Sequence, residues 1–383
     1  MWIKGKIYLR GLEEACVSFD RRIKEIRKEC RPDLKLPSDS YVFPAGVDMH
    51  VHLRGLELSY KETIASGTSE AVYGGIGVVV DMPNTVPIIN SVETIRLRLS
   101  ELGNYSRCDY GIYSGVTQDK GVAKMPIAGF KVFPEDLERD IQWILESPMV
   151  KVLHPEIPMS LRPGRHNRRL WQELASLYLV RGNFHVTHTT SLDTIKLAKR
   201  MGFSTDFTPH HLLVPGETDC LSKVNPPIRG KSERNSLLIA LTEADAVASD
   251  HAPHSVKEKS FPIELCPPGI AAVSFTLPFI FTLALRGAIT LGRAVELIST
   301  NPSRILGIPA GEIAVGNLAN FVIIRRERWR YSTTFSKMTH TPLDGFPLDA
   351  TVYATIVEGK VAYQDGNVFP VRGSNVFDKS GRT

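Results

Sequence analysis

The stretch Asp48-Met49-His50-Val51-His52-Leu53-Arg54-Gly55 ends an apolar run with two histidines and an arginine. Side chains alternate in direction along a strand, so His50 and His52 point to the same face and can hold one cation together. Arg54 continues the alternation and places a planar cationic group beside that cation, where it can pair with a substrate carboxylate. The alternative interpretation is an ordinary strand end with two hydrogen-bonded histidines.

Seven more short apolar or β-branched runs follow this octet, and segments of helical period separate most of them. Alternating strands and helices are typical of a parallel α/β fold, and eight such units indicate a TIM (β/α)8 barrel. Ser91 and Ser191 stand where helices over 92–102 and 192–200 would begin, which predicts that they are N-caps. The eight predicted strands are 42–53, 77–82, 110–116, 129–133, 150–154, 183–188, 204–208 and 245–249.

The two ends of the chain break this rhythm. Residues 3–19 and 354–369 have strand-like composition, and residues 311–324 alternate like a strand between glycine turns. We therefore expect a small composite β domain, formed from both termini, beside the barrel. The predicted division is 1–43 and 310–383 for the two parts of the β domain and 44–309 for the barrel.

Composition limits the classes of protein to consider. The chain has 383 residues, of which 43% are hydrophobic, and this is enough for a barrel-sized core. The formal net charge is only +5 and the basic residues are scattered, which argues against a nucleic-acid partner. No uncharged run approaches the ~20 residues of a membrane span, and no apolar leader opens the sequence, so we expect a cytoplasmic protein without membrane contact.

The five cysteines lie far apart and form no Cys-x-x-Cys pair. This spacing argues against a disulfide framework, a zinc ribbon or a redox dithiol, and it favours a reducing compartment. The cysteines are Cys16, Cys30, Cys108, Cys220 and Cys266.

Residues that can bind metal stand at the ends of several predicted strands. Because active sites of TIM barrels lie at the carboxyl ends of the strands, these side chains should converge on one mouth. Six ligand positions are too many for one tetrahedral zinc ion with an open site, but they suit two zinc ions that share a bridge. The six candidates are His50, His52, Lys131, His154, His188 and Asp250.

Lys131 differs from the other candidates because an ammonium beside two cations is repelled. Burial there would lower its pKa until the amine is neutral, and a neutral amine can react with carbon dioxide. The resulting carbamate has two oxygens and a negative charge, which suit a bridge between two ions. The alternative is a lysine whose stem packs in the barrel without any role at a metal.

His210 and His211 end the seventh predicted strand near the mouth. They could orient a metal ligand, or they could only form hydrogen bonds within their loop.

The motifs of this chain resemble, in the same order, those of the dihydroorotases, a family of the metal-dependent amidohydrolase superfamily. The resemblance covers most of the sequence. It implies a zinc-dependent enzyme for the reversible cyclisation of N-carbamoyl-L-aspartate to L-dihydroorotate in pyrimidine (UMP) biosynthesis. Besides the first octet, the matching motifs include Tyr60-Lys61-Glu62-Thr63-Ile64, Asp81-Met82-Pro83-Asn84-Thr85, Thr208-Pro209-His210-His211, Lys223-Val224-Asn225-Pro226-Pro227-Ile228-Arg229, Ser249-Asp250-His251-Ala252-Pro253-His254 and Asn301-Pro302-Ser303-Arg304.

The resemblance also implies roles for individual residues. It implies two zinc ions per subunit, bridged by a carboxylated Lys131 and a hydroxide, and it makes Asp250 the metal-bound carboxylate that carries the proton. The histidine ligands would be His50, His52, His154 and His188.

On the substrate side, Arg54, Asn84 and His254 resemble the clamp for the substrate carboxylate. Asn225 and the backbone around Pro267 and Gly269 resemble the groups that face the ring amide.

Other cyclic amidohydrolases, such as dihydropyrimidinases (hydantoinases) and allantoinases, share the same metal frame and are the alternative. Only a ring that bears a carboxylate makes use of a cationic clamp such as Arg54, Asn84 and His254, so the clamp favours dihydroorotase. A non-enzymatic relative that has lost its metals would lack a ligand, whereas every expected ligand is present. The resemblance also leaves open a homo-oligomer or an association with aspartate carbamoyltransferase.

Overall fold

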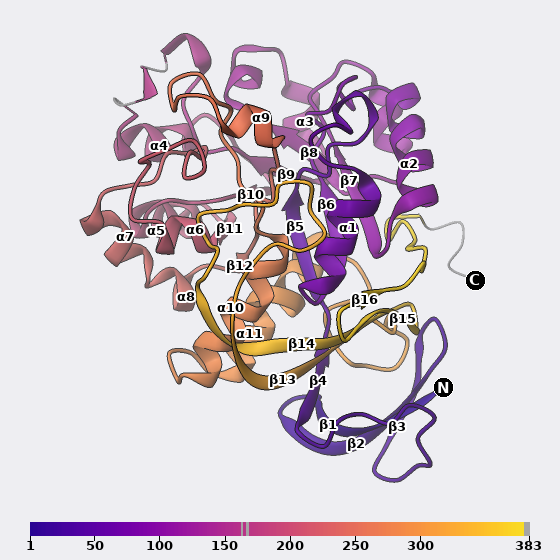
Figure 1. Ribbon diagram of the computed structural model, residues 1–383. Coiled ribbons are helices and arrows are strands. Elements are labelled where there is room, and N and C mark those ends of the chain that lie inside the picture. Colours follow the sequence, from indigo (N-terminus) through magenta and orange to yellow (C-terminus); the bar gives the residue numbers. More distant parts are fainter. Residues whose placement is uncertain (162–163, 166–167, 379–383) are drawn as a thin grey trace.

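The computed structural model describes residues 1–161, 164–165 and 168–378, and these form two eight-stranded sheets (Figure 1). In one sheet the strands follow each other in chain order and every pair is parallel. Its strands are β5 (Gly46–Val51), β6 (Ile76–Asp81), β7 (Asp109–Ser114), β8 (Gly129–Val132), β9 (Val150–Leu153), β10 (Phe184–Val186), β11 (Ser204–Phe207) and β12 (Ala246–Val247).

The first and last segments of this sheet meet, as a barrel requires. Val51 forms a parallel bridge with His251, and the amide of His52 donates to the carbonyl of His251 at 2.7 Å. The predicted TIM barrel is therefore confirmed, and each of its eight strands lies where the sequence indicated one.

The prediction of a single strand over residues 42–53 was wrong in one respect. The structure has two strands there, and they belong to different sheets. The chain changes partners at Ala45, whose amide donates to Asn320, whereas the amide of Gly46 donates to Gly75. The apolar run continues across this point because both strands are buried, so composition does not mark the boundary. The first strand of the pair is β4 (Ser40–Pro44).

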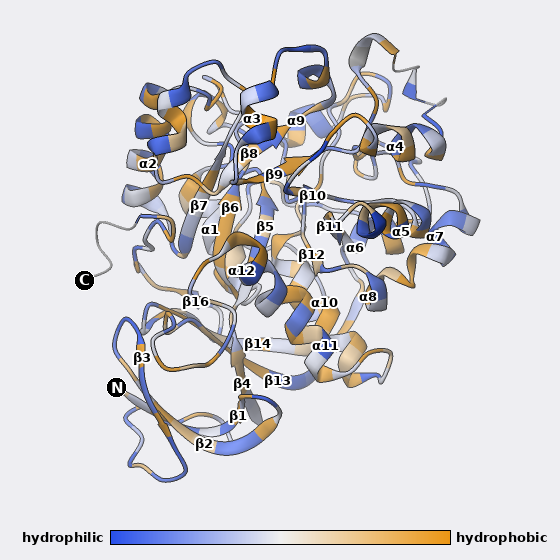
Figure 2. Ribbon diagram, turned by 180° about the vertical axis from the view of Figure 1, so that it is seen from behind, coloured by the Kyte–Doolittle hydropathy of each residue, from blue (hydrophilic) through white to orange (hydrophobic). Residues whose placement is uncertain are grey.

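The barrel strands are buried on both faces, which explains their continuous apolar composition. Figure 2 shows hydrophobic colour on β6 at the centre of the barrel and largely hydrophilic colour on the peripheral helix α7. Ser91 and Ser191 are the predicted N-caps, and each side chain accepts the amide of the residue three positions on, at 3.2 and 3.1 Å. The barrel helices and turns are η1 (Leu56–Leu58), α1 (Ile64–Tyr73), α2 (Val92–Tyr105), η2 (Lys120–Lys124), η3 (Pro134–Glu138), α3 (Gln142–Glu146), η4 (Met159–Leu161), α4 (Leu170–Leu177), α5 (Leu192–Arg200), α6 (Pro209–Leu213), α7 (Lys231–Leu237), α8 (Ala240–Glu243) and α9 (Val256–Lys259).

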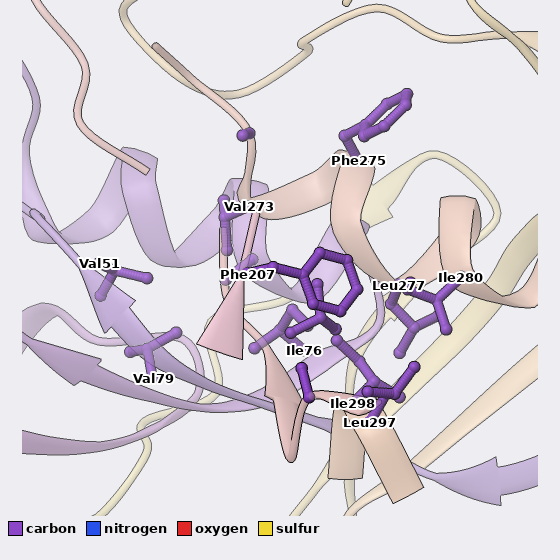
Figure 3. Packing of buried hydrophobic residues seen from close by; sticks show 14 of the residues in the cluster. Val51, Ile76, Val79, Phe207, Val273, Phe275, Leu277, Ile280, Leu297 and Ile298 are labelled. Carbon is purple, nitrogen blue, oxygen red and sulfur yellow. The ribbon is translucent and has the colours of Figure 1, made fainter. Parts of the chain in front are cut away.

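Helix α10 (Val273–Leu285) forms part of the main apolar core with the barrel strands. Figure 3 shows Leu277 and Ile280 of this helix near Ile76 of β6 and Phe207 of β11. Burying each such side chain contributes about 1.5–3 kcal/mol. No helix in the described part of the chain is long and apolar enough to cross a membrane. The remaining helical segments are α11 (Leu291–Val295), the π-helical turn η6 (Glu296–Thr300) and α12 (Asn301–Leu306).

The second sheet is built from both ends of the chain, as predicted. Val42 of β4 lies opposite Ile7 on one side and Ile323 on the other, so this strand joins the two terminal segments. β4 leads directly into the barrel, and Figure 1 shows this sheet below it. Its other strands are β1 (Trp2–Tyr8), β2 (Leu12–Phe19), β3 (Ile23–Arg27), β13 (Phe321–Arg330), β14 (Pro347–Val357), β15 (Lys360–Gln364) and β16 (Asn367–Val368).

The strand expected over 311–324 begins only at Phe321. Gly311 and Gly316 have φ angles of 78° and 92°, which are incompatible with an extended strand, and they make residues 311–320 a looped connection. The predicted domain boundaries at 43/44 and 309/310 stay a prediction.

The expectation that the chain lacks a disulfide framework was wrong. Cys16 of β2 pairs with Cys30, which follows β3, and Cys220 pairs with Cys266 between two loops, each with 6.0 Å between the Cα atoms. Cys108 is buried and free. Sequence separations of 14 and 46 residues gave no sign of either pair, because the fold and not the spacing brings the thiols together.

Candidate active site

A cavity of about 360 Å³ lies at the carboxyl ends of the barrel strands, and its volume is in the range of pockets for small ligands. All twelve residues that the sequence singled out line it. The sequence analysis did not assign the lining residues Phe133, Pro134, Glu135, Ala252 and Pro268 to the site. The twelve are His50, His52, Arg54, Asn84, Lys131, His154, His188, Asn225, Asp250, His254, Pro267 and Gly269.

His50, His52 and Asp250 form the tightest cluster in this cavity. One ligand atom from each lies within 4.8 Å of the other two. The Nε2 atoms of His50 and His52 are 3.3 and 3.1 Å from Oδ1 of Asp250. Two imidazole nitrogens and a carboxylate oxygen are donors that zinc prefers, so this cluster can hold a cation.

The charge states of this cluster also favour metal binding. Burial lowers the pKa of His50 well below its usual value and lowers that of His52, which keeps both rings neutral with a free lone pair. Burial opposes ionisation of Asp250, but a proton on His50 or His52 attracts its carboxylate, and these interactions outweigh burial and lower the pKa of the carboxyl below its usual range. The cluster therefore presents two neutral bases and one anion.

The other predicted histidine ligands continue the cluster across the mouth. The ring of His188 is centred 5.2 Å from the ring of His50 and 4.6 Å from that of His154. Nδ1 of His188 is buried without a hydrogen-bond partner in the described part of the chain. Leaving such an atom unsatisfied costs about 1–3 kcal/mol, and a bound cation would satisfy it.

Lys131 of β8 is fully buried, and its Nζ likewise has no hydrogen-bond partner within the described residues. Nζ lies 5.2 Å from the centre of the Phe133 ring. Burial lowers the pKa of this ammonium from its usual value to about 7. A large share of the Lys131 side chains would thus be neutral amines at neutral pH.

Hydrogen bonds fix the ring orientation of His50. Oγ1 of Thr187 donates to Asp206 at 2.9 Å, so it accepts from Nδ1 of His50 at 2.7 Å. His50 therefore carries its proton on Nδ1, and the lone pair of Nε2 faces Asp250. Thr187 directly follows β10 and Asp206 lies in β11, and neither residue was identified from the sequence.

His52 and His154 are oriented in a similar way. Nδ1 of His52 lies 2.7 Å from Oδ1 of Asn84, which can only accept, so Nε2 of His52 again faces the cluster. Nε2 of His154 lies 2.7 Å from the carboxylate of Glu156. Asn84 thus contacts a predicted ligand in addition to lining the cavity, and Glu156, like Thr187 and Asp206, was not identified from the sequence.

Three residues of the site have backbone conformations that are rare outside glycine. The φ angles of Arg54, His188 and Asp250 are 54°, 38° and 45°. Each such conformation costs about 1–3 kcal/mol and persists only where its surroundings enforce it. The backbone amide of His188 donates to Oδ1 of Asp206 at 2.6 Å, and this hydrogen bond helps to hold the backbone of His188 in its conformation.

The substrate side of the cavity is built around Arg54. The guanidinium is buried, its Nε donates to the carbonyl of Pro253 at 3.0 Å, and its Nη2 lies 3.2 Å from Nε2 of His254. Burial lowers its pKa to about 10, which leaves Arg54 positively charged at neutral pH. A buried cation beside a cavity is suited to bind an anionic group of a ligand.

Another part of the cavity wall comes from two loops, which carry Asn225 and residues 267–269. Oδ1 of Asn225 accepts from Nη1 of Arg165 at 2.6 Å. The amide of Gly269 donates to the carbonyl of Lys223 at 2.8 Å, and the carbonyl of Pro267 accepts from Lys259 at 3.1 Å. The predicted backbone groups therefore line the cavity but also bind other parts of the protein.

His210 and His211 lie in α6 and differ in their contacts. Both ring nitrogens of His211 form hydrogen bonds. Nδ1 lies 2.6 Å from Oγ1 of Thr208, and Nε2 lies 3.0 Å from the carbonyl oxygen of Pro226. Both ring nitrogens of His210 are buried without a partner among the residues described. For His211 the loop interpretation is confirmed.

Comparisons with known proteins agree with this geometry. Residues 40–130 match the Dihydro-orotase-like family, and residues 182–362 match the Amidohydrolase family. Relatives named dihydroorotase include a protein of Sulfolobus acidocaldarius, 56% identical over all of both chains, and one of Saccharolobus solfataricus, 55% identical over 99% of each.

Solved structures with the same fold are more distant in sequence. L-hydantoinase (dihydropyrimidinase) from Arthrobacter aurescens has a TM-score of 0.85 at 20% identity and covers 97% of this chain and 98% of its own. D-hydantoinase (dihydropyrimidinase) from a Thermus species has a TM-score of 0.85 at 21% identity and covers all of both chains. At this level of identity the likeness establishes the fold alone.

Proposed function

Because the chain belongs to the dihydroorotase family, we propose that it interconverts N-carbamoyl-L-aspartate and L-dihydroorotate, a step of pyrimidine biosynthesis. The observation that carries this proposal is the position of the buried Arg54 in the same cavity as the His50, His52 and Asp250 cluster. A cyclic amide with a ring carboxylate matches both halves of that cavity, because the carboxylate suits Arg54 and the amide suits the metal-binding cluster.

Two zinc ions fit the metal side. His50, His52 and Asp250 would hold one ion, His154 and His188 the other, and a carboxylated Lys131 would lie between them. The unpartnered Nζ of Lys131 and Nδ1 of His188 support this assignment, since both are buried polar atoms that need a partner. When bound, such ions lower the pKa of water and polarise a carbonyl group.

Asp250 acts as the general base and acid. In ring opening, its carboxylate takes a proton from the attacking water as the new C–O bond forms at the ring carbonyl. It then gives that proton to the ring nitrogen as the C–N bond breaks, which yields the open carbamoyl amino acid. Ring closure follows the same steps in reverse and releases water.

Arg54, Asn84 and His254 bind the ring carboxylate and so fix the ring relative to Asp250. The guanidinium supplies two parallel N–H donors, and His254 lies beside it. Asn225, Pro267 and Gly269 form the wall that faces the ring amide.

The test is a substrate panel with purified, zinc-loaded protein. We expect turnover of L-dihydroorotate in both directions and little turnover of dihydrouracil, hydantoin or allantoin, whose rings lack the carboxylate. Turnover of dihydrouracil at a comparable kcat/KM would instead identify a dihydropyrimidinase. Elemental analysis of the same sample should give two zinc ions per chain.

The cellular setting follows from the proposed reaction. We propose a cytoplasmic enzyme that acts on a small molecule, and a homo-oligomer or an association with aspartate carbamoyltransferase stays a prediction. Size measurement of the purified protein, alone and with the carbamoyltransferase, tests both forms of assembly.

A further inference from the structure

Lys61, which follows the first barrel strand, contacts the far side of the His254 ring. Its Nζ lies 3.3 Å from Nδ1 of His254 and 2.9 Å from Oε1 of Glu258. The other ring nitrogen of His254, Nε2, lies 3.0 Å from the carbonyl oxygen of Pro268 and 3.2 Å from Nη2 of Arg54. His254 therefore lies between a lysine on one side and the substrate cavity on the other.

These contacts determine which nitrogen of His254 carries the proton. An ammonium group has only donors, so Nδ1 can bond to Lys61 only if Nδ1 offers its lone pair. The ring is buried between Arg54 and Lys61, and burial together with these two charges lowers the pKa of His254 to about 2. A neutral ring with a free lone pair on Nδ1 must carry its hydrogen on Nε2, where it donates to Pro268.

We propose that Lys61 is a positioning residue that fixes His254 as the Nε2–H tautomer and so makes it a hydrogen-bond donor to the substrate carboxylate. This inference rests on the proposed function, and it adds a residue and a chemical reason to the carboxylate clamp. In this tautomer, Nε2–H of His254 and Nη2 of Arg54 are neighbouring donors, and a bound carboxylate would accept from both, sharing Nε2–H with the carbonyl of Pro268 or replacing that carbonyl.

The opposite tautomer would defeat the clamp. With the hydrogen on Nδ1, the ring would direct a donor at the ammonium of Lys61 and present a lone pair on Nε2 to the cavity. That lone pair would repel a carboxylate, and it would accept a hydrogen bond from Arg54 at the 3.2 Å separation already present. Oε2 of Glu258 lies 3.7 Å from Nδ1 and would accept from an Nδ1–H group, but the ammonium of Lys61 is closer to Nδ1, at 3.3 Å, and pairs with Glu258, so it repels that hydrogen and disfavours this arrangement.

The direct test is nitrogen NMR of the zinc-loaded protein labelled with ¹⁵N-histidine, with His254→Gln to assign the signals. In the wild type we expect Nε2 of His254 to be protonated and Nδ1 to be unprotonated. In Lys61→Met we expect the Nδ1–H form to become populated, and in Lys61→Arg, which keeps a donor-only cation, the wild-type tautomer should persist. A wild-type ring protonated on Nδ1, or a ring unaffected by Lys61→Met, would overturn the proposal.

Kinetics give the second readout. Loss of a hydrogen bond to a charged group should raise KM for dihydroorotate roughly tenfold in Lys61→Met, with zinc content unchanged and kcat within about twofold. Lys61→Arg should retain most of the wild-type KM. The matched control is Lys257→Met, which removes one exposed lysine from α9 near the same loop and should leave KM unchanged.

The outcomes separate this inference from the proposed function. A fall in kcat with an unchanged KM, or an equal rise of KM in Lys257→Met, would contradict the role of Lys61. Absence of dihydroorotate turnover in the wild type would contradict the proposed function, while the NMR measurement would still report whether Lys61 sets the tautomer.

Discussion

The two sides of the cavity are held in place in different ways. The metal side consists of residues on or directly after barrel strands, such as His50, Lys131 and His188, and residues at other barrel strands orient its histidines, as Thr187 and Asp206 do for His50 and His188. The substrate side, which includes Asn84, Asn225, His254 and residues 267–269, lies on loops whose positions depend on contacts between distant segments. The barrel topology therefore fixes the metal side, whereas individual loop contacts fix the substrate side.

This difference predicts how each side responds to substitution. Changes on the metal side should abolish the chemistry and leave the surrounding strands in place. Changes on the substrate side should mainly weaken binding of the substrate, because loops can shift without disturbing the metal.

The largest effect is expected for Asp250→Ala. Removal of the general base and acid should lower kcat by about 10²–10⁴-fold or below detection, while the remaining ligands keep zinc bound. Steady-state kinetics and elemental analysis on the same sample check this. The isosteric Asp250→Asn should be equally inactive, and turnover close to wild type in either variant would remove Asp250 from its assigned role.

Lys131→Ala comes next, because it removes the proposed bridge but not the proton carrier. We expect loss of turnover and partial recovery when a small carboxylic acid such as acetate is added, since its two oxygens can replace those of the carbamate. Activity is measured against acetate concentration.

Lys151→Ala is the matched control for this prediction. Lys151 is a fully buried lysine in the adjacent strand β9, and its Nζ donates to the carbonyl of Ser147 at 2.6 Å and not into the cavity. Acetate should not raise the activity of Lys151→Ala. Full activity of Lys131→Ala without any additive would exclude the carbamate.

On the substrate side, Arg54→Met should raise KM for dihydroorotate roughly 10- to 100-fold, because two charge-assisted hydrogen bonds to the carboxylate are lost. Zinc content should stay the same, and the slow hydrolysis of a ring without a carboxylate should change little. An unchanged KM for dihydroorotate would show that the carboxylate is bound elsewhere.

The difference between the strand-borne metal side and the loop-borne substrate side also explains what the sequence could predict. The ends of parallel strands must meet at one rim, so a metal-competent residue at the end of a predicted strand, such as His154 or Asp250, could be placed from the strand pattern alone. The loop residues Asn84, His254 and Pro267 were placed through family motifs and not through geometry. No motif indicated the partners Thr187, Asp206 and Glu156, and Lys61 stood in a family motif without an assigned role, because a side-chain hydrogen bond leaves no periodic trace in the sequence.

The cysteines show this limit most clearly. Spacing gave no reason to pair Cys220 with Cys266, yet the bond joins the two loops that carry Asn225 and Pro267. Lys223, between them, donates to the carbonyl of Cys266 at 2.7 Å and reinforces the same connection. The wall of the cavity that faces the substrate thus depends on a covalent contact between segments that are remote in the sequence.

The smallest expected effect on substrate binding therefore comes from Cys220→Ser, and Cys16→Ser is its control. Each removes one disulfide and should lower the free energy of unfolding by about 2–4 kcal/mol, which thermal melting with and without reductant measures. Only Cys220→Ser loosens a wall of the cavity, so it alone should raise KM, by about two- to fivefold on the scale of a weakened contact, with kcat and zinc content retained. Cys16–Cys30 lies beside the terminal sheet, away from the residues that line the cavity, and its loss should leave KM unchanged. An equal change of KM in both variants would mean that general stability, and not the loop connection, controls the substrate side.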